Sequence, residues 1–316
     1  MLVTIILLVL IIIVLAYLYD VRRRWFNKYK QSLSYLNAEQ IYRHLCCVEF
    51  PFECFYGINL AFYRTFVSPT ISNVYSQTNT IASETEKRVN DTDIIMHAWI
   101  DYGLDSNEGR ASIQHLNNIH GAFRNHTLNK DFVFILCCFT VDTIQIIEVF
   151  GWRHLDDREK RAIFDFYEQV GQRMNLKDRP TSLKEANIIV NSYIDSDTCS
   201  RYTKQGQVLT NAIHTLVQKW YGRYLPALLI RILLNAIIYV VGGATFHRKL
   251  GLPEPSRFLL YIVYILAAIR RCIMQFVPPR NGIHHLSDNL MKKDYKCPVS
   301  QANFLQVGPS KLLQQL

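Results

Sequence analysis

The uncharged N-terminal segment constrains the fold of this chain more than any other feature. Residues 1–19 read MLVTIILLVLIIIVLAYLY, a stretch long enough to cross the roughly 30 Å hydrocarbon core of a bilayer as one helix. The arginines at 22–24 follow directly, and Lys28 and Lys30 come after them. Because such basic flanks stay on the cytosolic side, the order predicts an N-terminal anchor with the rest of the chain in the cytosol. A buried core helix is the alternative.

The remaining composition favours helices. The 316 residues include only 13 Gly and 10 Pro, and segments rich in Leu, Ile, Tyr and Phe dominate. We therefore predict an all-α protein with one helical domain. Its parts are a transmembrane anchor (1–19), a basic juxtamembrane segment (20–36), the helical domain (37–280) and a polar C-terminal extension (281–316).

The net charge of +9 does not indicate a nucleic-acid partner. Residues 1–30 carry +4 and the residues from Asn281 onward carry +2, so the segment between them holds only +3. Proteins that bind a phosphate backbone concentrate their basic residues on one stripe. This charge distribution offers no such stripe, and we expect no nucleic acid to bind.

Several common enzyme classes lack their signatures. The sequence has no GxGxxG, P-loop, HExxH or GxSxG motif, so nothing supports a nicotinamide enzyme, a kinase or a hydrolase. Its eight cysteines form no C-x-x-C pair, and several lie in apolar runs. Buried reduced thiols are therefore expected, and a zinc cage is not.

The segment from 87 to 131 has the pattern of an internal ligand site. Arg88 and Thr92 are one helical turn apart, on a stripe that continues through Ile95 and Trp99. The next helix is predicted to begin near Arg110. These positions predict a helix that presents one basic and one hydroxyl side chain toward the interior.

His120 is the candidate ligand on that next helix, where it shares a face with apolar side chains. His115 points about 140° away around the helix, so the two histidines cannot chelate one metal ion. A lone histidine on an apolar face is more often a packed core residue than a ligand. Both interpretations stay open on the pattern alone.

Two later apolar segments, 225–243 and 258–269, are predicted to be core helices, with the surface of the membrane as a further place for them. In the first, Arg231 and Asn235 fall on one stripe, which suggests packing inside a bundle because an arginine facing lipid is costly. The second has only 12 residues, about 18 Å as a helix. A multi-pass topology in which both segments span the membrane is the alternative.

Five segments in sequence order resemble a known family. They are EFPFECFYGINLAFYRTFVSPTISNVYSQT, KRVNDT, RASIQHLNNIHGAFRN, NKDFVFILCCF and GWRHLDDREKRAIFDFYEQVGQRMNL. Together they resemble the domain of ER-bound MpaB-type oxygenases of fungi and, more distantly, that of bacterial latex-clearing rubber oxygenases. The resemblance covers roughly residues 40–280.

This resemblance implies an all-helical domain that binds haem b. It assigns His120 as the proximal ligand of the haem iron and places Arg88 and Thr92 beside the haem, where Arg88 would contact a propionate or bound oxygen. The implied reaction is oxidative cleavage or oxidation of a carbon–carbon double bond by dioxygen in an isoprenoid or lipid-like substrate. The implied location is the endoplasmic reticulum membrane, with the domain facing the cytosol.

One residue departs from the family pattern. Rubber oxygenases often carry a basic or amide side chain directly before the threonine, and this chain has Asp91 there. An acid cannot supply the same donor at neutral pH, which argues against rubber as the substrate. Lys87 could compensate, but it is also placed to pair with Asp91 at i,i+4. A non-catalytic haem- or lipid-binding protein of the same fold is therefore the alternative function.

Overall fold

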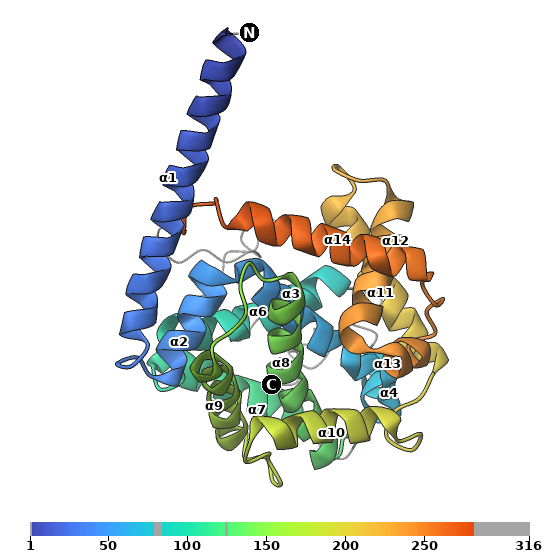
Figure 1. Ribbon diagram of the computed structural model, residues 1–316. Helices are drawn as coiled ribbons and strands as arrows, with labels where there is room; N and C mark the ends of the chain where they lie inside the picture. Colours follow the sequence, from blue (N-terminus) through green and yellow to red (C-terminus); the bar gives the residue numbers. More distant parts are fainter. Residues whose placement is uncertain (1, 79–83, 124–125, 281–316) are drawn as a thin grey trace.

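The computed structural model describes residues 2–78, 84–123 and 126–280. These residues form a single helical domain with one long helix projecting from it, and no strand occurs among them (Figure 1). The all-α prediction is confirmed. The polar extension predicted at 281–316 lies outside the described residues.

α1 (Leu2–Ser32) is the projecting helix. Its apolar part is long enough to cross a membrane and is not buried at all within the domain, so it is a candidate anchor. From Arg22 onward the helix packs on the domain, and Tyr29 and Leu33 are buried there. The segment predicted as a separate juxtamembrane region is therefore largely the docked end of α1.

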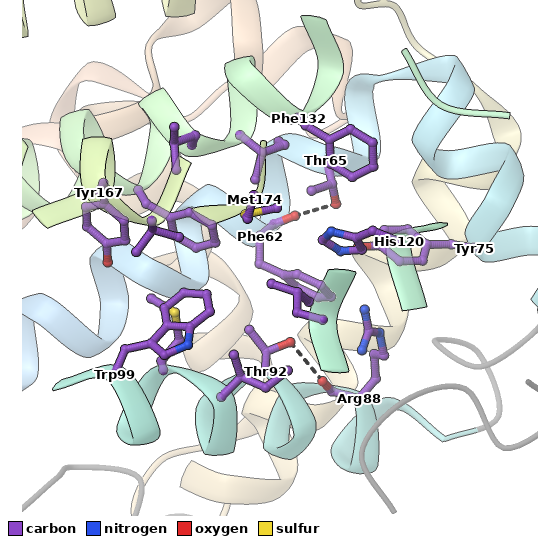
Figure 2. Close-up of a pocket in the computed structure, with 17 residues that line it drawn as sticks. Phe62, Thr65, Tyr75, Arg88, Thr92, Trp99, His120, Phe132, Tyr167 and Met174 are labelled. Carbon is purple, nitrogen blue, oxygen red and sulfur yellow. Dashed lines mark hydrogen bonds between the residues drawn. The ribbon is translucent and has the colours of Figure 1, made fainter. Parts of the chain in front are cut away.

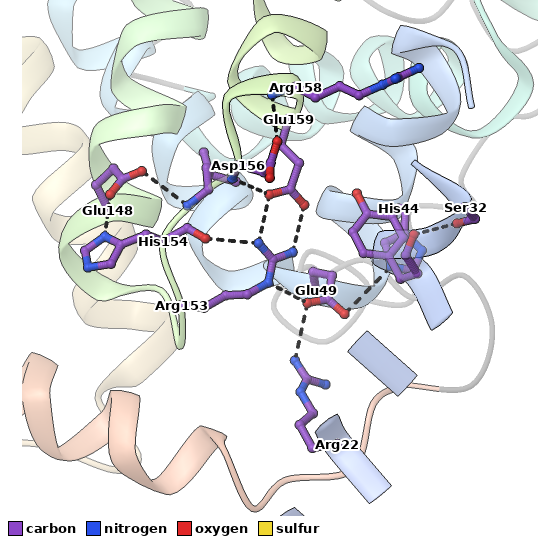
Figure 3. Close-up of polar contacts among 12 residues, drawn as sticks. Arg22, Ser32, His44, Glu49, Glu148, Arg153, His154, Asp156, Arg158 and Glu159 are labelled. Carbon is purple, nitrogen blue, oxygen red and sulfur yellow. Dashed lines mark hydrogen bonds and ion pairs between the residues drawn. The ribbon is translucent and has the colours of Figure 1, made fainter. Parts of the chain in front are cut away.

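A buried charge cluster attaches α1 to the domain (Figure 3). Glu49 lies 3.8 Å from Arg22 of α1 and 3.4 Å from Arg153. Arg153 also forms a fork with Glu159 at 2.8 and 2.7 Å, and His44 lies 3.7 Å from Glu49. Burial alone would raise the pKa of Glu49, but these three basic neighbours outweigh it and lower the pKa. The carboxylate therefore stays charged and holds α1 in place.

The centre of the domain is the pair formed by α3 (Pro51–Arg64) and α8 (Asn129–Phe150). α8 is apolar and long enough to span a membrane, yet 67% of its most apolar stretch is buried inside the domain, so it is a core helix here. Gly57 lets the two helices approach closely, because a Cβ there would meet Thr143 Cα at 2.5 Å. Within the pair, Arg64 and Asp142 form a buried ion pair.

Three further helices surround this pair: α2 (Ala38–His44), α9 (Asp157–Arg173) and α10 (Leu183–Asp195). Asn37 caps α2 with the capping box expected for its sequence. A π-helical turn (Leu45–Glu49) follows α2, and Pro51 then begins α3 after a bend of 111°.

The helices that carry the candidate site are α4 (Pro69–Thr78), α6 (Thr85–Tyr102) and α7 (Asn107–Gly121). Gly103, with φ +88°, ends α6 in a conformation that favours glycine. α7 begins three residues before the predicted Arg110, because the Ser106 hydroxyl accepts a hydrogen bond from the Gly109 N–H at 2.8 Å.

The C-terminal helices are α11 (Lys204–Tyr221), α12 (Ala227–Gly242), α13 (Ala244–Lys249) and α14 (Arg257–Met274). α12 buries one side in the domain. The prediction that α14 is a core helix is wrong, since only Val263 and Ala267 of its side chains are buried. The polar stripe predicted for α12 does not lie on one buried face. Asn235 is buried and hydrogen-bonded to His247 and to the Pro253 carbonyl, whereas Arg231 is exposed.

Candidate functional site

An apolar cavity of about 120 Å³ lies between α3, α6, α7, α8 and α9 (Figure 2). Its walls are mainly large apolar side chains, among them Phe62, Met96, Trp99, Phe132, Phe139 and Met174. A second cavity, of about 110 Å³, adjoins it toward α4. Both are lined by Thr65, Tyr75, Arg88, His120, Phe132 and Ile135, so these six side chains stand between the two spaces.

The structure brings together all three residues that the sequence nominated. Arg88 and Thr92 reach the first cavity from α6, and His120 reaches it from α7 (Figure 2). Ile95 and Trp99 line it as well, which confirms the predicted stripe on α6. Residues from two helices therefore converge on one apolar space.

Local hydrogen bonds fix the two helices against each other. Trp99 Nε1 of α6 donates to Ser112 Oγ of α7 at 2.9 Å, inside the core. Ser112 in turn donates to the Gly109 carbonyl at 2.8 Å. This chain sets the position of His120 relative to Arg88.

The half-buried side chain of Arg88 has a hydrogen-bond donor that is not used within the described residues. Its Nε is buried and has no hydrogen-bond partner among the described residues. Its guanidinium carbon lies 6.0 Å from the centre of the Tyr75 ring, a loose cation–π contact. Leaving a guanidinium donor buried without a partner is costly, so the site is suited to an anionic group of a ligand.

His120 directs its imidazole into the cavity (Figure 2). The Phe132 ring packs against it with the ring centroids 4.9 Å apart. His115 is buried but lines neither cavity, in agreement with its predicted direction. Of the two histidines on α7, only His120 can contact a ligand there.

Thr92 has its hydroxyl engaged locally, since Thr92 Oγ1 donates to the Arg88 carbonyl at 3.2 Å. Asp91, next to it, lines neither cavity. Its carboxylate is buried and pairs with Lys87 Nζ at 2.7 Å. The i,i+4 pair anticipated from the sequence is therefore present, and neither of its charges faces the cavity.

Sequence reasoning missed the side chains that α4, α9 and the turn after α9 supply. Tyr75 comes from α4, and Tyr167, Val170 and Met174 come from α9 and the turn that follows it. Tyr167 is held by a hydrogen bond of 2.6 Å between its hydroxyl and that of Tyr42. Only the apolar periodicity of α9 marked these positions, and periodicity does not say which cavity a face will line.

A comparison with protein families now adds to this geometry. The model of the family described as "ER-bound oxygenase mpaB/B'/Rubber oxygenase, catalytic domain" matches residues 54–272. The chain belongs to this family. The matched range includes both cavities and every residue named above as lining them.

Characterised relatives agree with the assignment at low identity. ER-bound oxygenase mpaB of Penicillium brevicompactum is 25% identical over 164 residues, which are 50% of this chain and 42% of that protein. ER-bound oxygenase mpaB' of the same organism is 26% identical and covered over 39% of its length. The mpaB of Penicillium roqueforti (strain FM164) is 26% identical and covered over 55%. The chain spans about half the length of these relatives.

Proposed function

We propose that this protein is a membrane-anchored, haem b-dependent oxygenase that oxidises or cleaves a carbon–carbon double bond in an isoprenoid or lipid-like substrate. One observation carries the proposal: the His120 imidazole and the Arg88 guanidinium, whose Nε is buried, reach the same apolar cavity. Membership of an oxygenase family supports the reaction class. The apolar walls of the cavity support a lipid-like substrate.

The residues present fit haem b in their chemistry. One imidazole is enough for haem iron, because the porphyrin supplies the in-plane ligands, and the described part of the chain has no cluster of three or more His, Cys, Asp or Glu for a bare metal ion. His120 would hold the iron, and the unpartnered Nε of Arg88 would donate to a propionate. Each cavity is smaller than the several hundred Å³ typical of ligand sites, so binding requires movement of the side chains between them.

When bound, the haem supplies an iron centre that can bind and activate dioxygen. The protein's part is to exclude water and hold a hydrocarbon chain against Phe62, Trp99 and Phe139. Arg88 acts as a hydrogen-bond donor, because a guanidinium presents its N–H groups in a fixed planar fork. Among residues 2–78, 84–123 and 126–280, no carboxylate or lysine lines either cavity, so we propose no proton transfer by such a group from the wall.

We place the protein in the endoplasmic reticulum membrane, with the domain on the cytosolic side. The relatives are named ER-bound, and α1 supplies a candidate anchor. The arginines at 22–24 follow its apolar part directly, which favours a cytosolic domain.

The second candidate is a non-catalytic haem- or lipid-binding protein. The position of Asp91 favours it, because this side chain pairs with Lys87 and lines neither cavity. The two candidates differ in whether bound haem reacts with dioxygen when an unsaturated substrate is present.

An absorption spectrum with a pyridine-haemochrome assay on the purified full-length chain tests the cofactor. We expect a Soret band that His120→Ala removes and that Arg88→Met weakens several-fold, with far-UV circular dichroism unchanged. His126→Ala is the matched control, since His126 is exposed on the turn after α7. Folded wild-type protein that takes up no supplied haem would refute the proposal. Haem binding without oxygen uptake on isoprenoids or unsaturated lipids would select the non-catalytic candidate.

A further inference from the structure

α14 presents an apolar face to its surroundings that nothing in the described chain covers. Phe258, Tyr261, Ile265, Ile269 and Ile273 are each at least half exposed. Their spacing of three and four residues puts them on one side of the helix. No Asp, Glu or Lys occurs anywhere in α14. Soluble proteins rarely leave so large a contiguous apolar surface in water.

The opposite side of α14 is held firmly, so the exposed face has a fixed direction. Arg270 Nη1 donates to Glu53 Oε1 and to the Phe150 carbonyl, each at 2.5 Å. Arg271 donates to the Gly151 carbonyl at 3.0 Å and to the Glu148 carbonyl at 2.9 Å. Two arginines thus attach α14 to the end of α8, and the helix cannot roll its apolar face inward.

The turn between α11 and α12 and the start of α12 continue this surface. Tyr224 and Leu225 of the turn and Leu228 and Leu229 of α12 are exposed, and α12 packs beside α14 (Figure 1). Two separate parts of the chain therefore expose apolar side chains on the same side of the domain.

The membrane anchor projects from that side. α14 crosses the domain where α1 leaves it (Figure 1), and Phe276, just after α14, contacts Tyr19 of α1 with ring centroids 6.0 Å apart. Tyr19 is the last residue of the uncharged stretch. The end of α14 is therefore level with the point at which α1 would enter the polar surface of a bilayer.

The part of the chain that contains α12 and α14 is also strongly basic. Residues 220–280 contain seven arginines, one lysine and a single glutamate, a net charge of +7, whereas residues 31–219 carry −4. An apolar face flanked by arginines is the composition of helices that lie in the surface of anionic membranes.

We propose that the exposed face of α14, with the α11–α12 turn, lies in the leaflet that α1 enters and forms a second membrane contact of the domain. The apolar side chains would reach the boundary between headgroups and acyl chains, with the exposed Arg223 and Arg257 at the phosphates. The proposal does not depend on haem binding or on the reaction.

Nitroxide spin labels on the full-length chain in vesicles of phosphatidylcholine and phosphatidylserine test this contact. The background replaces Cys199, Cys272 and Cys297 by serine, since the first two are at least partly exposed and Cys297 lies outside the described residues. One label is placed at Ile265→Cys on α14. The matched control is Ile188→Cys on α10, at the other end of the domain, because the two isoleucines are 57% and 54% exposed.

We expect the label at 265 to be several-fold more accessible to molecular oxygen than to a water-soluble nickel chelate, compared with the label at 188. Equal ratios at the two positions would show that α14 faces water and would overturn the proposal. Low access to both reagents at 265 would also overturn it. That result would mean that residues 281–316 or a second copy of the chain covers the face.

Discussion

Removing the carboxylate of Asp142 should destabilise the domain more than any surface change, because it leaves Arg64 charged in the core. Arg64 donates to Asp142 three times, at 3.0, 2.7 and 2.7 Å. Their side chains are 3% and 0% exposed. Arg64 also lies over the Phe246 ring at 4.7 Å. The pair joins α3 to α8, the two helices at the centre of the domain.

The loss of stability depends on which of the two side chains, Arg64 or Asp142, remains in the core without its partner. Breaking a buried pair by removing one partner costs roughly 3–5 kcal/mol, and a guanidinium cannot escape this cost by losing its proton. We therefore expect Asp142→Leu to cost about 4 kcal/mol, or a decrease in Tm of roughly 10 °C for a domain of this size. Arg64→Met should cost less, because burial already raises the pKa of Asp142 and the isolated carboxyl can bind a proton.

The double variant Arg64→Met/Asp142→Leu distinguishes this reasoning from a simple loss of contacts. Replacing both charges by apolar groups is often close to neutral, so its Tm should recover most of the way to wild type. Thermal unfolding at a fixed scan rate in one detergent measures all four proteins. Asp165→Asn, in the exposed pair with Arg161, should change stability by less than about 0.5 kcal/mol. A double variant no more stable than Asp142→Leu would refute the argument.

Two further predictions use single residues and matched controls. Gly57→Ala should lower the free energy of unfolding by about 1–3 kcal/mol, because its Cβ would meet Thr143 Cα at 2.5 Å. Gly121→Ala is the control, since a Cβ there has open space and should not destabilise the domain. Equal Tm values for the two variants would contradict the close approach of α3 and α8. Burial, aided by nearby positive charge, lowers the pKa of His214 from 6.5 to about 4, so between these values the unfolded chain binds the additional proton and stability falls as the pH decreases. Denaturant unfolding should show that the free energy of unfolding decreases by roughly 3 kcal/mol between pH 7 and pH 4. His214→Leu should remove this decrease, and the exposed-site control His126→Leu should keep it. The same decrease in both variants would contradict the assignment to His214.

Local sequence patterns predicted the elements whose signals are themselves local. The uncharged stretch before the arginines predicted α1. The starts of α2 and α10 have signals that are just as local, since the side chains of Asn37 and Ser182 cap these helices. α14 was assigned wrongly for a physical reason. Apolar content predicts that a side chain avoids water, but protein and lipid satisfy that requirement equally well. Only the packing of the neighbouring helices shows that the described part of the chain leaves the apolar face of α14 uncovered.

Some residues of the candidate site were predicted from local sequence patterns, and others depend on how distant helices pack together. Helical periodicity placed Arg88, Thr92 and Trp99 on one stripe, because residues three to four apart in one helix share a face. The contributions of Tyr75 and Tyr167 depend on how α4 and α9 pack against α6, which no local pattern contains. Asp142 is a further case: an acid inside an apolar helix requires a partner, but its partner Arg64 lies far away in the sequence.

The attachment of α1 and the direction of α14 together bear on how a lipid-like substrate would meet the cavity. A single flexible anchor would let the domain tumble, but Arg22 of α1 is buried beside Glu49, and the helix continues unbroken into the docked segment. α14 is fixed separately by Arg270 and Arg271. Because these two attachments use different helices of the same rigid core, a bilayer that accepts both would hold the domain in one orientation. The cavity at His120 would then keep a constant direction relative to the lipid surface.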